Sequence, residues 1–368
     1  MLRDVSVDLG AISHNFARIQ QIVSPAEVMP IVKADAYGHG AVRVAESLVD
    51  SGARRLGVAD SIEALELRAA GVSVPILCWL FDPAQAFGPL ISAEVAIGVS
   101  TLQQLELVAE AASLVGRAKI HIKLDTGLGR NGFAAADWQL AFERTAAVLD
   151  SGLVEVEGTF SHLANASQSE NLEQRDRFEA GLGQLQAAGI NPGIRHLAAS
   201  EAAIATPELR YDLVRVGIAS YGQSPTKELD LAQLGMRPAM RVAASVVNVK
   251  HVPAGHGVSY GFDYRTSRPT QLALVAFGYA DGLPRQAAGF EVLLNGRRVP
   301  IVGRIAMDQF VLDIGDLECQ IGDEVVIVGN ADHGEPTASE LAEKAGTINY
   351  DIVTRMGRRP GRRYLEGE

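Results

Sequence analysis

An alternation of short apolar runs and amphipathic stretches repeats from about residue 28 to about residue 230 of this chain. Each unit begins with β-branched apolar residues, typical of a buried strand, and continues after a polar or glycine break at helical spacing. We expect strands at 28–33, 55–60, 74–80, 95–100, 120–125, 154–162, 194–198 and 213–216. We expect helices at 41–49, 62–70, 102–115, 139–149 and 175–187. About eight such units close a (β/α)8 barrel, so the sequence predicts an α/β protein with an N-terminal TIM-type barrel.

The pattern changes near residue 233, and the rest of the chain is rich in expected strands. These lie at 242–252, 271–277, 291–294, 298–302, 309–314 and 324–328. Asn295-Gly296 stands between two of them and predicts a tight hairpin, because both residue types accept positive φ. We therefore expect a barrel domain over 1–233 and a C-terminal mainly β domain over 234–368, with residues 5–8 a candidate for pairing with the second domain.

Net charge and cysteine content limit the classes of binding partner and the cellular compartment expected for this chain. The 33 basic and 44 acidic side chains give a net charge of −11, which argues against a nucleic acid or an anionic membrane and leaves a small molecule as the expected partner. Cys78 and Cys319 are too few for a disulfide scaffold and form no zinc-type pair, which fits a reducing cytoplasm. The start of the chain lacks a signal-like apolar region, and no apolar run reaches the ~18 residues of a membrane span. The basic run 358–363 is expected to be an exposed tail.

Polar residues interrupt the expected barrel strands at one position, the C-terminal end. They are Lys33, Asp60, Lys123, Asp125, His162, His196, Ser200 and Arg215. Any one of these polar residues, taken alone, is explained as a charged or polar side chain that reaches solvent at the end of a strand. Together they lie where the carboxyl ends of barrel strands form the active-site face, so they are the candidate site residues.

Two regions of this strand-end face predict a particular chemistry, one at Lys33 and one at Ser200, Arg215 and Gly217. Lys33 ends an apolar run before glycines, and desolvation there would lower its pKa and favour a nucleophile or a Schiff base with an aldehyde cofactor; a lysine that merely reaches solvent is the alternative. Arg215 lies at the end of the eighth strand and Gly217 follows it, while Ser200 follows the seventh strand, and barrels bind phosphate in these loops through backbone N–H groups. A lysine and a phosphate site in one barrel are what pyridoxal phosphate requires.

Several motifs together resemble those of the alanine racemases, pyridoxal-phosphate enzymes with a barrel and a C-terminal β domain. The motifs lie at 32–40, 123–130, 215–218, 258–261, 278–282, 303–309 and 348–350. The resemblance covers essentially the whole chain, and the motifs of the second domain make it specific. It implies interconversion of L- and D-alanine for the bacterial cell wall by a cytoplasmic homodimer with shared active sites and no metal.

The resemblance also implies a role for each site residue. Lys33 would hold pyridoxal phosphate and act as one acid/base group, and Tyr260 from the opposite subunit would act as the other, polarised through His162 and Arg215. Racemisation needs two such groups because the proton leaves one face of Cα and returns to the other. The phosphate would be bound by Tyr37, Ser200, Gly217, Ile218 and Tyr350. Arg130 and the backbone N–H of Met307 would bind the substrate carboxylate, with Lys123, Tyr279 and Asp308 in supporting roles.

Two of these residues carry a further expectation. Lys123 aligns with a lysine that is carbamylated in some members of the family, where the new carboxylate orients Arg130. Arg215 would face the pyridine nitrogen of the cofactor, and since a guanidinium does not readily give up its proton, the ring would remain a weaker electron sink. We expect this to suppress side transamination.

The sequence leaves alternatives open. Ala199 and Ala306 depart from the family pattern, and Ala306 could widen the substrate side enough for larger amino acids such as serine. An amino-acid decarboxylase on the same barrel would need acidic residues and a cysteine at the site. A non-catalytic pyridoxal-phosphate carrier would lack the second domain, and a metal-dependent hydrolase would use His39, His162 and His196.

Overall fold

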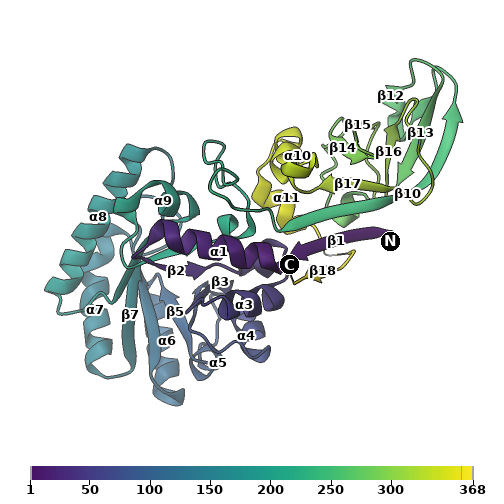
Figure 1. Cartoon of the computed structure of the whole chain (residues 1–368). Coiled ribbons are helices and arrows are strands. Elements are labelled where there is room, and N and C mark those ends of the chain that lie inside the picture. The colour runs from purple at the N-terminus through teal and green to yellow at the C-terminus, as the bar shows by residue number, and fades with distance from the viewer. Residues whose placement is uncertain (1, 358, 367–368) are drawn as a thin grey trace.

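Eight parallel strands form the N-terminal barrel in the computed structural model, which describes residues 2–357 and 359–366 (Figure 1). In chain order they are β2 (Glu27–Pro30), β3 (Leu56–Asp60), β4 (Ile76–Leu80), β5 (Val95–Val99), β6 (Ala118–Lys123), β7 (Val154–Phe160), β8 (Ile194–Ala199) and β9 (Leu213–Val216). Neighbours pair in sequence order, β9 pairs with β2, and a bridge between Ile31 and Gly57 closes the ring. The predicted fold class is confirmed. The first strand ends at Pro30, earlier than expected, so that Lys33 opens a turn.

Helices surround this barrel, and the sequence reasoning missed three of them. They are α1 (Leu9–Val23), α3 (Ala41–Asp50), α4 (Ser61–Ala69), α5 (Gly88–Ser92), α6 (Leu102–Val115), α7 (Trp138–Asp150), α8 (Gln168–Ala187) and α9 (Ser200–Ala205). The three that were not predicted are the long α1 and the short α5 and α9. The last barrel strand is followed only by the 3-10 turn η3 (Ile218–Tyr221). The unpredicted α1 packs against α3, α9 and η3, so a helix that precedes the first strand covers this side of the barrel.

The second sheet is also eight-stranded and is built mainly by the C-terminal half. Its members are β1 (Arg3–Asp8), β10 (Met240–Val252), β13 (Thr270–Val275), β14 (Glu291–Leu294), β15 (Arg297–Val302), β16 (Phe310–Asp313), β17 (Glu324–Val328) and β18 (Arg363–Leu365). A small ribbon of β11 (Gly257–Val258) and β12 (Tyr264–Arg265), with α10 (Ala338–Ala345) and α11 (Asn349–Arg355), completes this part. The Asn295-Gly296 hairpin forms as predicted, with both φ positive.

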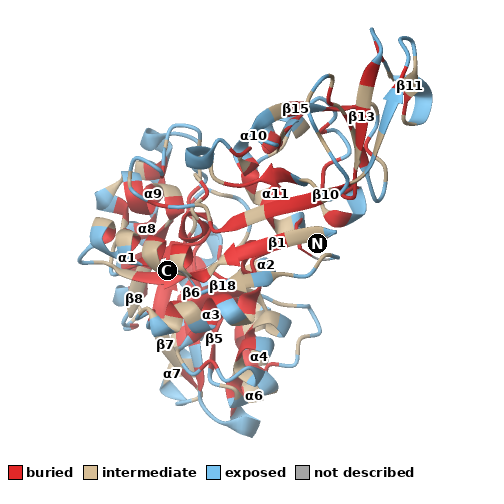
Figure 2. Cartoon of the chain, turned by 45° about the vertical axis from the view of Figure 1, so that its right-hand side comes forward, coloured by how far each residue is buried: buried red, intermediate tan, exposed pale blue. Residues whose placement is uncertain are grey.

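The two ends of the chain join the second sheet side by side. β1 pairs antiparallel with β10 and parallel with β18, so the segment 5–8 pairs with the second domain (Figure 1). The expectation of an exposed basic tail is wrong at Arg362, whose side chain is only 15% exposed and pairs with Asp35 of the barrel. Arg359 and Arg363 are exposed as expected, and Arg358 lies outside the described residues. The barrel strands and the first half of β10 are mostly buried (Figure 2).

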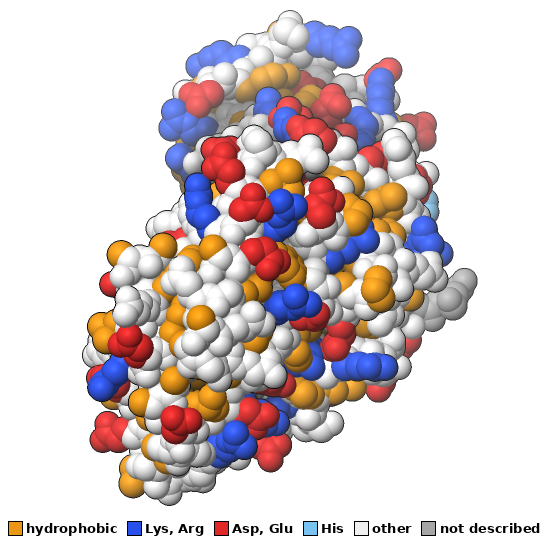
Figure 3. All heavy atoms as spheres, turned by 90° about the vertical axis from the view of Figure 1, so that its left-hand side faces the viewer, with side chains coloured by type: hydrophobic (Ala, Val, Ile, Leu, Met, Phe, Trp, Pro, Cys, Tyr) orange, Lys and Arg blue, Asp and Glu red, His pale blue; other side chains and the backbone are white. Residues whose placement is uncertain are grey.

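Charge is mixed over the outside of the molecule. Acidic and basic side chains are interspersed on the face seen in Figure 3. Within the described ranges, no helix combines the length and apolar character that a membrane crossing requires.

Candidate active site

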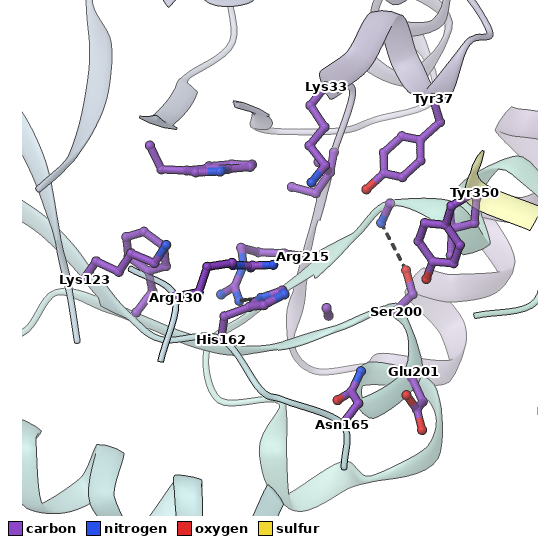
Figure 4. Close-up of a pocket in the computed structure, with 16 residues that line it drawn as sticks. Lys33, Tyr37, Lys123, Arg130, His162, Asn165, Ser200, Glu201, Arg215 and Tyr350 are labelled. Carbon is purple, nitrogen blue, oxygen red and sulfur yellow. Dashed lines mark hydrogen bonds between the residues drawn. The ribbon is translucent and has the colours of Figure 1, made fainter. Parts of the chain in front are cut away.

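A cavity of about 330 Å³ opens at the C-terminal ends of the barrel strands (Figure 4). It brings together most of the residues that the sequence predicted for the site. Those that line it are Lys33, Tyr37, Lys123, Arg130, His162, Ser200, Arg215, Gly217, Ile218 and Tyr350. Ile31, Trp79, Phe160, Asn165, Ala199 and Glu201 complete the lining.

The turn that carries Lys33 has an unusual backbone. After Lys33, residues 34–37 all have positive φ between 52° and 55°, which amounts to one turn of left-handed helix, α2 (Lys33–Tyr37). Such a conformation costs roughly 1–2 kcal/mol per non-glycine residue, so contacts from elsewhere must hold it. Glu63 accepts the N–H of Ala34 at 2.6 Å. This turn directs Lys33 and Tyr37 into the same cavity (Figure 4).

The C-terminal strand supplies the second set of contacts to this turn. Arg362 donates from Nε to the carbonyl of Gly38 at 2.6 Å and pairs through Nη2 with Asp35 at 2.6 Å. The Tyr364 hydroxyl lies so close to Gly40 that a Cβ there would stand 1.8 Å from it. The left-handed turn is therefore clamped by residues that are more than 300 positions away in the sequence.

Positive charge dominates the cavity. Burial lowers the pKa of Lys33, Arg130 and Arg215 lower it further, and Glu63 opposes them. Burial, with Arg215 and Arg130 next, lowers the pKa of Lys123 to about 8. Burial and the same cations hold the pKa of His162 well below its ordinary value, so this imidazole is neutral. A site of this kind favours an anionic ligand and a lysine whose amine is easily deprotonated.

Arg215 lies at the floor of the cavity and is held from several sides. Its Nη1 and Nη2 groups donate to the carbonyls of Ser161, His196 and Leu197 and to ring nitrogens of His162 and His196, at 2.7–3.1 Å. Among the described residues, none accepts its Nε–H. This remaining donor is available to an acceptor atom of a ligand in the cavity.

An anion cradle lies at the other end of the cavity. Gly217 donates its N–H to Ser200 Oγ at 3.1 Å, and a Cβ on Gly217 would stand 2.2 Å from Tyr37 Oη. The Tyr37 ring lies 6.1 Å from the Tyr350 ring, centroid to centroid. Hydroxyls and backbone N–H groups thus converge where only a glycine leaves room, which fits the phosphate of pyridoxal phosphate, as the free Nε–H of Arg215 fits its pyridine nitrogen.

Four predicted residues lie outside this cavity. Tyr260, Tyr279 and Met307 are 69%, 42% and 53% exposed, all on the second domain. Asp308 pairs with Arg359 on that domain. Within one protomer the structure does not bring these residues to Lys33.

Three other strand-end residues have roles in the fold. Asp60 caps α4 through its side chain, and Asp125 accepts the N–H groups of Gly127 and Gly129. His196 points inside the barrel, beneath Arg215. Cys319 does not line the cavity, and no cluster of metal-ligating side chains occurs in the described part of the chain.

Sequence reasoning missed Glu63 and Trp79 as neighbours of the site. Glu63 closes the capping box of α4 and also accepts the N–H of Ala34. The spacing of Asp60 and Glu63 is a capping-box signal that could have indicated the helix start. The contact with the Lys33 turn has no such signal, because it depends on the packing of two neighbouring barrel units.

The fold and the cavity together define the class of this protein. It is a barrel enzyme with an appended β domain and a cation-lined site that contains a central lysine. The models of the alanine racemase N-terminal and C-terminal domains match residues 7–225 and 239–364. The chain therefore belongs to the alanine racemase family, which confirms the resemblance, and it is an amino-acid racemase of the isomerase class.

Individual relatives agree over the full length. The alanine racemase of Thermobifida fusca is 45% identical over 366 residues, 98% of this chain and 97% of that protein. The crystal structure of alanine racemase from Streptomyces lavendulae superposes with a TM-score of 0.98 at 45% identity, covering 100% of this chain and 98% of that one. The structure from Bacillus anthracis, solved with bound L-Ala-P, gives a TM-score of 0.90 at 36% identity, covering 99% and 95%.

Proposed function

We propose that this chain interconverts L- and D-alanine with pyridoxal phosphate attached at Lys33, as a homodimer whose two sites are each completed by Tyr260 of the partner subunit. The observation that carries the proposal is the position of Lys33, between the Arg130–Arg215 cations and the cradle at Ser200 and Gly217. Family membership supports D-alanine for peptidoglycan as the product used by the cell. The cytoplasmic location stays a prediction.

The cavity contains a group for each part of the cofactor. When bound, pyridoxal phosphate supplies an electron-withdrawing ring that acidifies the Cα–H of an attached amino acid. The hydroxyls of Tyr37, Ser200 and Tyr350 and the backbone at Gly217 and Ile218 would hold the phosphate. The Arg215 Nε–H would donate to the pyridine nitrogen without transferring its proton, because a guanidinium remains charged at neutral pH.

Two side chains would then move the proton. The Lys33 Nζ, whose pKa burial lowers, takes or returns it on one face of Cα. The partner subunit's Tyr260 would act on the other face. Exposure of Tyr260 on its own protomer supports this arrangement, since a reactive phenol with no cavity around it needs a second surface to complete its site. Arg215, which donates to Nδ1 of the neutral His162, would place positive charge near that phenol and stabilise its anion.

Substrate recognition would use the remaining cations and the second domain. Arg130 would pair with the substrate carboxylate, with the backbone N–H of the partner subunit's Met307 as a fixed second donor. Tyr279 and Tyr350 would narrow the entrance. The small Ala306 beside Met307 leaves a broader specificity, such as serine, as a second candidate.

Isotope exchange tests the reaction. Purified protein with pyridoxal phosphate is incubated with L-alanine in D₂O, and optical rotation and Cα deuteration are followed. We expect loss of rotation with deuterium incorporation, abolished in Lys33→Ala and greatly reduced in Tyr260→Phe. Tyr264→Phe, another tyrosine of the same domain, is the matched control. Release of carbon dioxide would select a decarboxylase, and conversion of serine faster than alanine would select the broader racemase.

Mixing inactive variants tests the shared site. In a mixed dimer of Lys33→Ala and Tyr260→Phe, one site lacks both groups and the other has both. Random exchange makes half of all dimers mixed, so about a quarter of the wild-type activity returns. No recovery after verified subunit exchange would contradict the sharing of Tyr260 between subunits, while leaving the reaction itself to the exchange experiment.

A further inference from the structure

A chain of buried polar side chains runs through the barrel interior below the site. We infer that His196, His121 and Glu157 form a directional hydrogen-bond chain that positions Arg215, making His121 and Glu157 positioning residues for the racemase. The proposal rests on the proposed function for the role of Arg215, but the chain itself is a property of the protein alone. None of the family motifs includes His121 or Glu157.

A continuous series of short contacts links Arg215 in the candidate active site to Glu157 in the lower barrel. Arg215 Nη1 lies 2.9 Å from His196 Nδ1, and His196 Nε2 lies 2.9 Å from His121 Nδ1. His121 Nε2 lies 3.4 Å from Glu157 Oε2, and Arg55 reaches the other carboxylate oxygen at 3.3 Å. Arg215, His196 and His121 are at most 5% exposed. His121 and Glu157 line a small cavity with residues from the lower barrel strands, away from the active-site mouth.

The chemistry of the two ends sets the direction of every hydrogen bond. Arg215 can only donate, so His196 Nδ1 must accept and its proton must sit on Nε2. That proton is donated to His121 Nδ1, which leaves the His121 proton on Nε2, facing the carboxylate. An ionised Glu157 can only accept. One protonation pattern therefore satisfies all contacts, with both histidines neutral.

The charge states agree with this pattern. Burial holds the pKa of His196 well below its ordinary value and also lowers that of His121. The hydrogen bond from His121 lowers the pKa of Glu157 to about 2, so the carboxylate is ionised at neutral pH. Neutral imidazoles are thus held between a buried cation and an anion.

Packing fixes the rings in the orientation that the chain needs. The Phe160 ring stacks on His196 with centroids 4.8 Å apart and planes 2° apart. A Cβ on Gly158 would stand 2.5 Å from His121 Nδ1, so only glycine leaves room for this imidazole. Barrel interiors are usually filled with branched apolar side chains, and buried polar groups are costly unless each is satisfied. The chain is satisfied only if Arg215 keeps its position, and this couples the lower barrel to the floor of the site.

Nitrogen NMR of histidine-labelled protein tests the protonation pattern without reference to activity. The holoenzyme contains 8 histidines, and single substitutions assign the signals. We expect His196 to be neutral with a protonated Nε2 and an unprotonated Nδ1 at pH 7. In His121→Asn, whose carboxamide oxygen replaces Nδ1 as the acceptor, the pattern should persist. In His121→Leu the acceptor for the His196 Nε2 proton is removed, so this protonation pattern of His196 should be lost.

Kinetics then test the coupling to Arg215. His121→Leu should lower kcat about ten- to a hundred-fold, as expected when a hydrogen bond to a charged network is broken, with KM little changed. Side transamination, read as pyruvate per racemisation turnover, should rise. His121→Asn should recover most of both. Val58→Ala is the control, since it removes volume at a fully buried residue of barrel strand β3 that is not part of the hydrogen-bond chain.

Clear results would overturn the inference. A proton on His196 Nδ1, or a doubly protonated ring at pH 7, would rule out the direction of the chain. A His121→Leu enzyme whose kcat and partition ratio match those of Val58→Ala would rule out the positioning role. If the wild-type protein does not racemise alanine at all, the proposed function fails, while the tautomer of His196 still decides whether the hydrogen-bond chain exists.

Discussion

Carbon dioxide should react with Lys123 in preference to the other lysines. Lys123 ends β6 with its side chain buried beside Arg215 and Arg130. The neutral amine adds to the carbon of carbon dioxide, an N–C bond forms, a π pair moves to oxygen, and the amine loses one proton. The product is a carbamate with a charge of −1 in place of the +1 of the ammonium. Next to two arginines, this change turns repulsion into attraction.

The pKa of Lys123 sets the size of the effect. With a pKa of about 8, roughly one amine in four is neutral at pH 7.5, against about one in a thousand at the ordinary value of 10.5. The reactive form is thus more abundant by about two orders of magnitude before the attraction to Arg130 is included. At a fixed pressure of carbon dioxide, occupancy should rise with pH through about 8.

Labelled bicarbonate gives the measurement. Protein equilibrated with ¹³C-bicarbonate should show a carbamate signal in the carbon NMR spectrum, and alkylation followed by mass spectrometry should place it on Lys123. The signal should vanish in Lys123→Met and persist in Lys119→Arg, since Lys119 lies exposed on the same strand. No signal at pH 8, or one that survives in Lys123→Met, would refute the reasoning.

Two further substitutions test how the site is held. Arg362→Ala should lower the free energy of unfolding by about 1–3 kcal/mol, because it removes both contacts to the Lys33 turn, whereas Arg363→Ala at an exposed ion pair should cost under about 1 kcal/mol in denaturant titrations. An equal loss in both would contradict the clamp. Gly217→Ala should displace Tyr37 and weaken pyridoxal phosphate binding at least ten-fold in absorbance titrations. Gly183→Ala, on an exposed helix face with open space around it, should bind normally and be stabilised by up to about 1 kcal/mol; unchanged affinity in Gly217→Ala would refute the cradle.

Much of the fold was accessible from local patterns. Alternating apolar runs predicted the barrel, and Asn295-Gly296 predicted its hairpin, because strand periodicity and turn chemistry are written in neighbouring residues. The helix α1 was missed. Its role on the barrel depends on the absence of a full helix after β9, which is known only once the chain has closed.

The residues of the candidate site also fall into those that the sequence predicted and those that depend on tertiary structure. Strand-end polarity identified Lys33, Arg215 and Ser200, since parallel strands bring their carboxyl ends to one face of a barrel. The exposed position of Tyr260 could not be anticipated from its motif, because exposure is set by the packing of the whole second domain.

Local sequence therefore determines the strand–helix units of the barrel, the lysine that follows the first barrel strand, and the glycines that let the backbone approach a ligand. Three-dimensional packing accounts for the rest. Arg362 meets the left-handed turn from the far end of the chain, and His121 meets Arg215 through His196 across the barrel interior. Such contacts join residues from 19 to 324 positions apart, and neither propensity nor spacing encodes which of them will be neighbours. Burial then sets their charge, because desolvation and nearby cations act only after the barrel has closed.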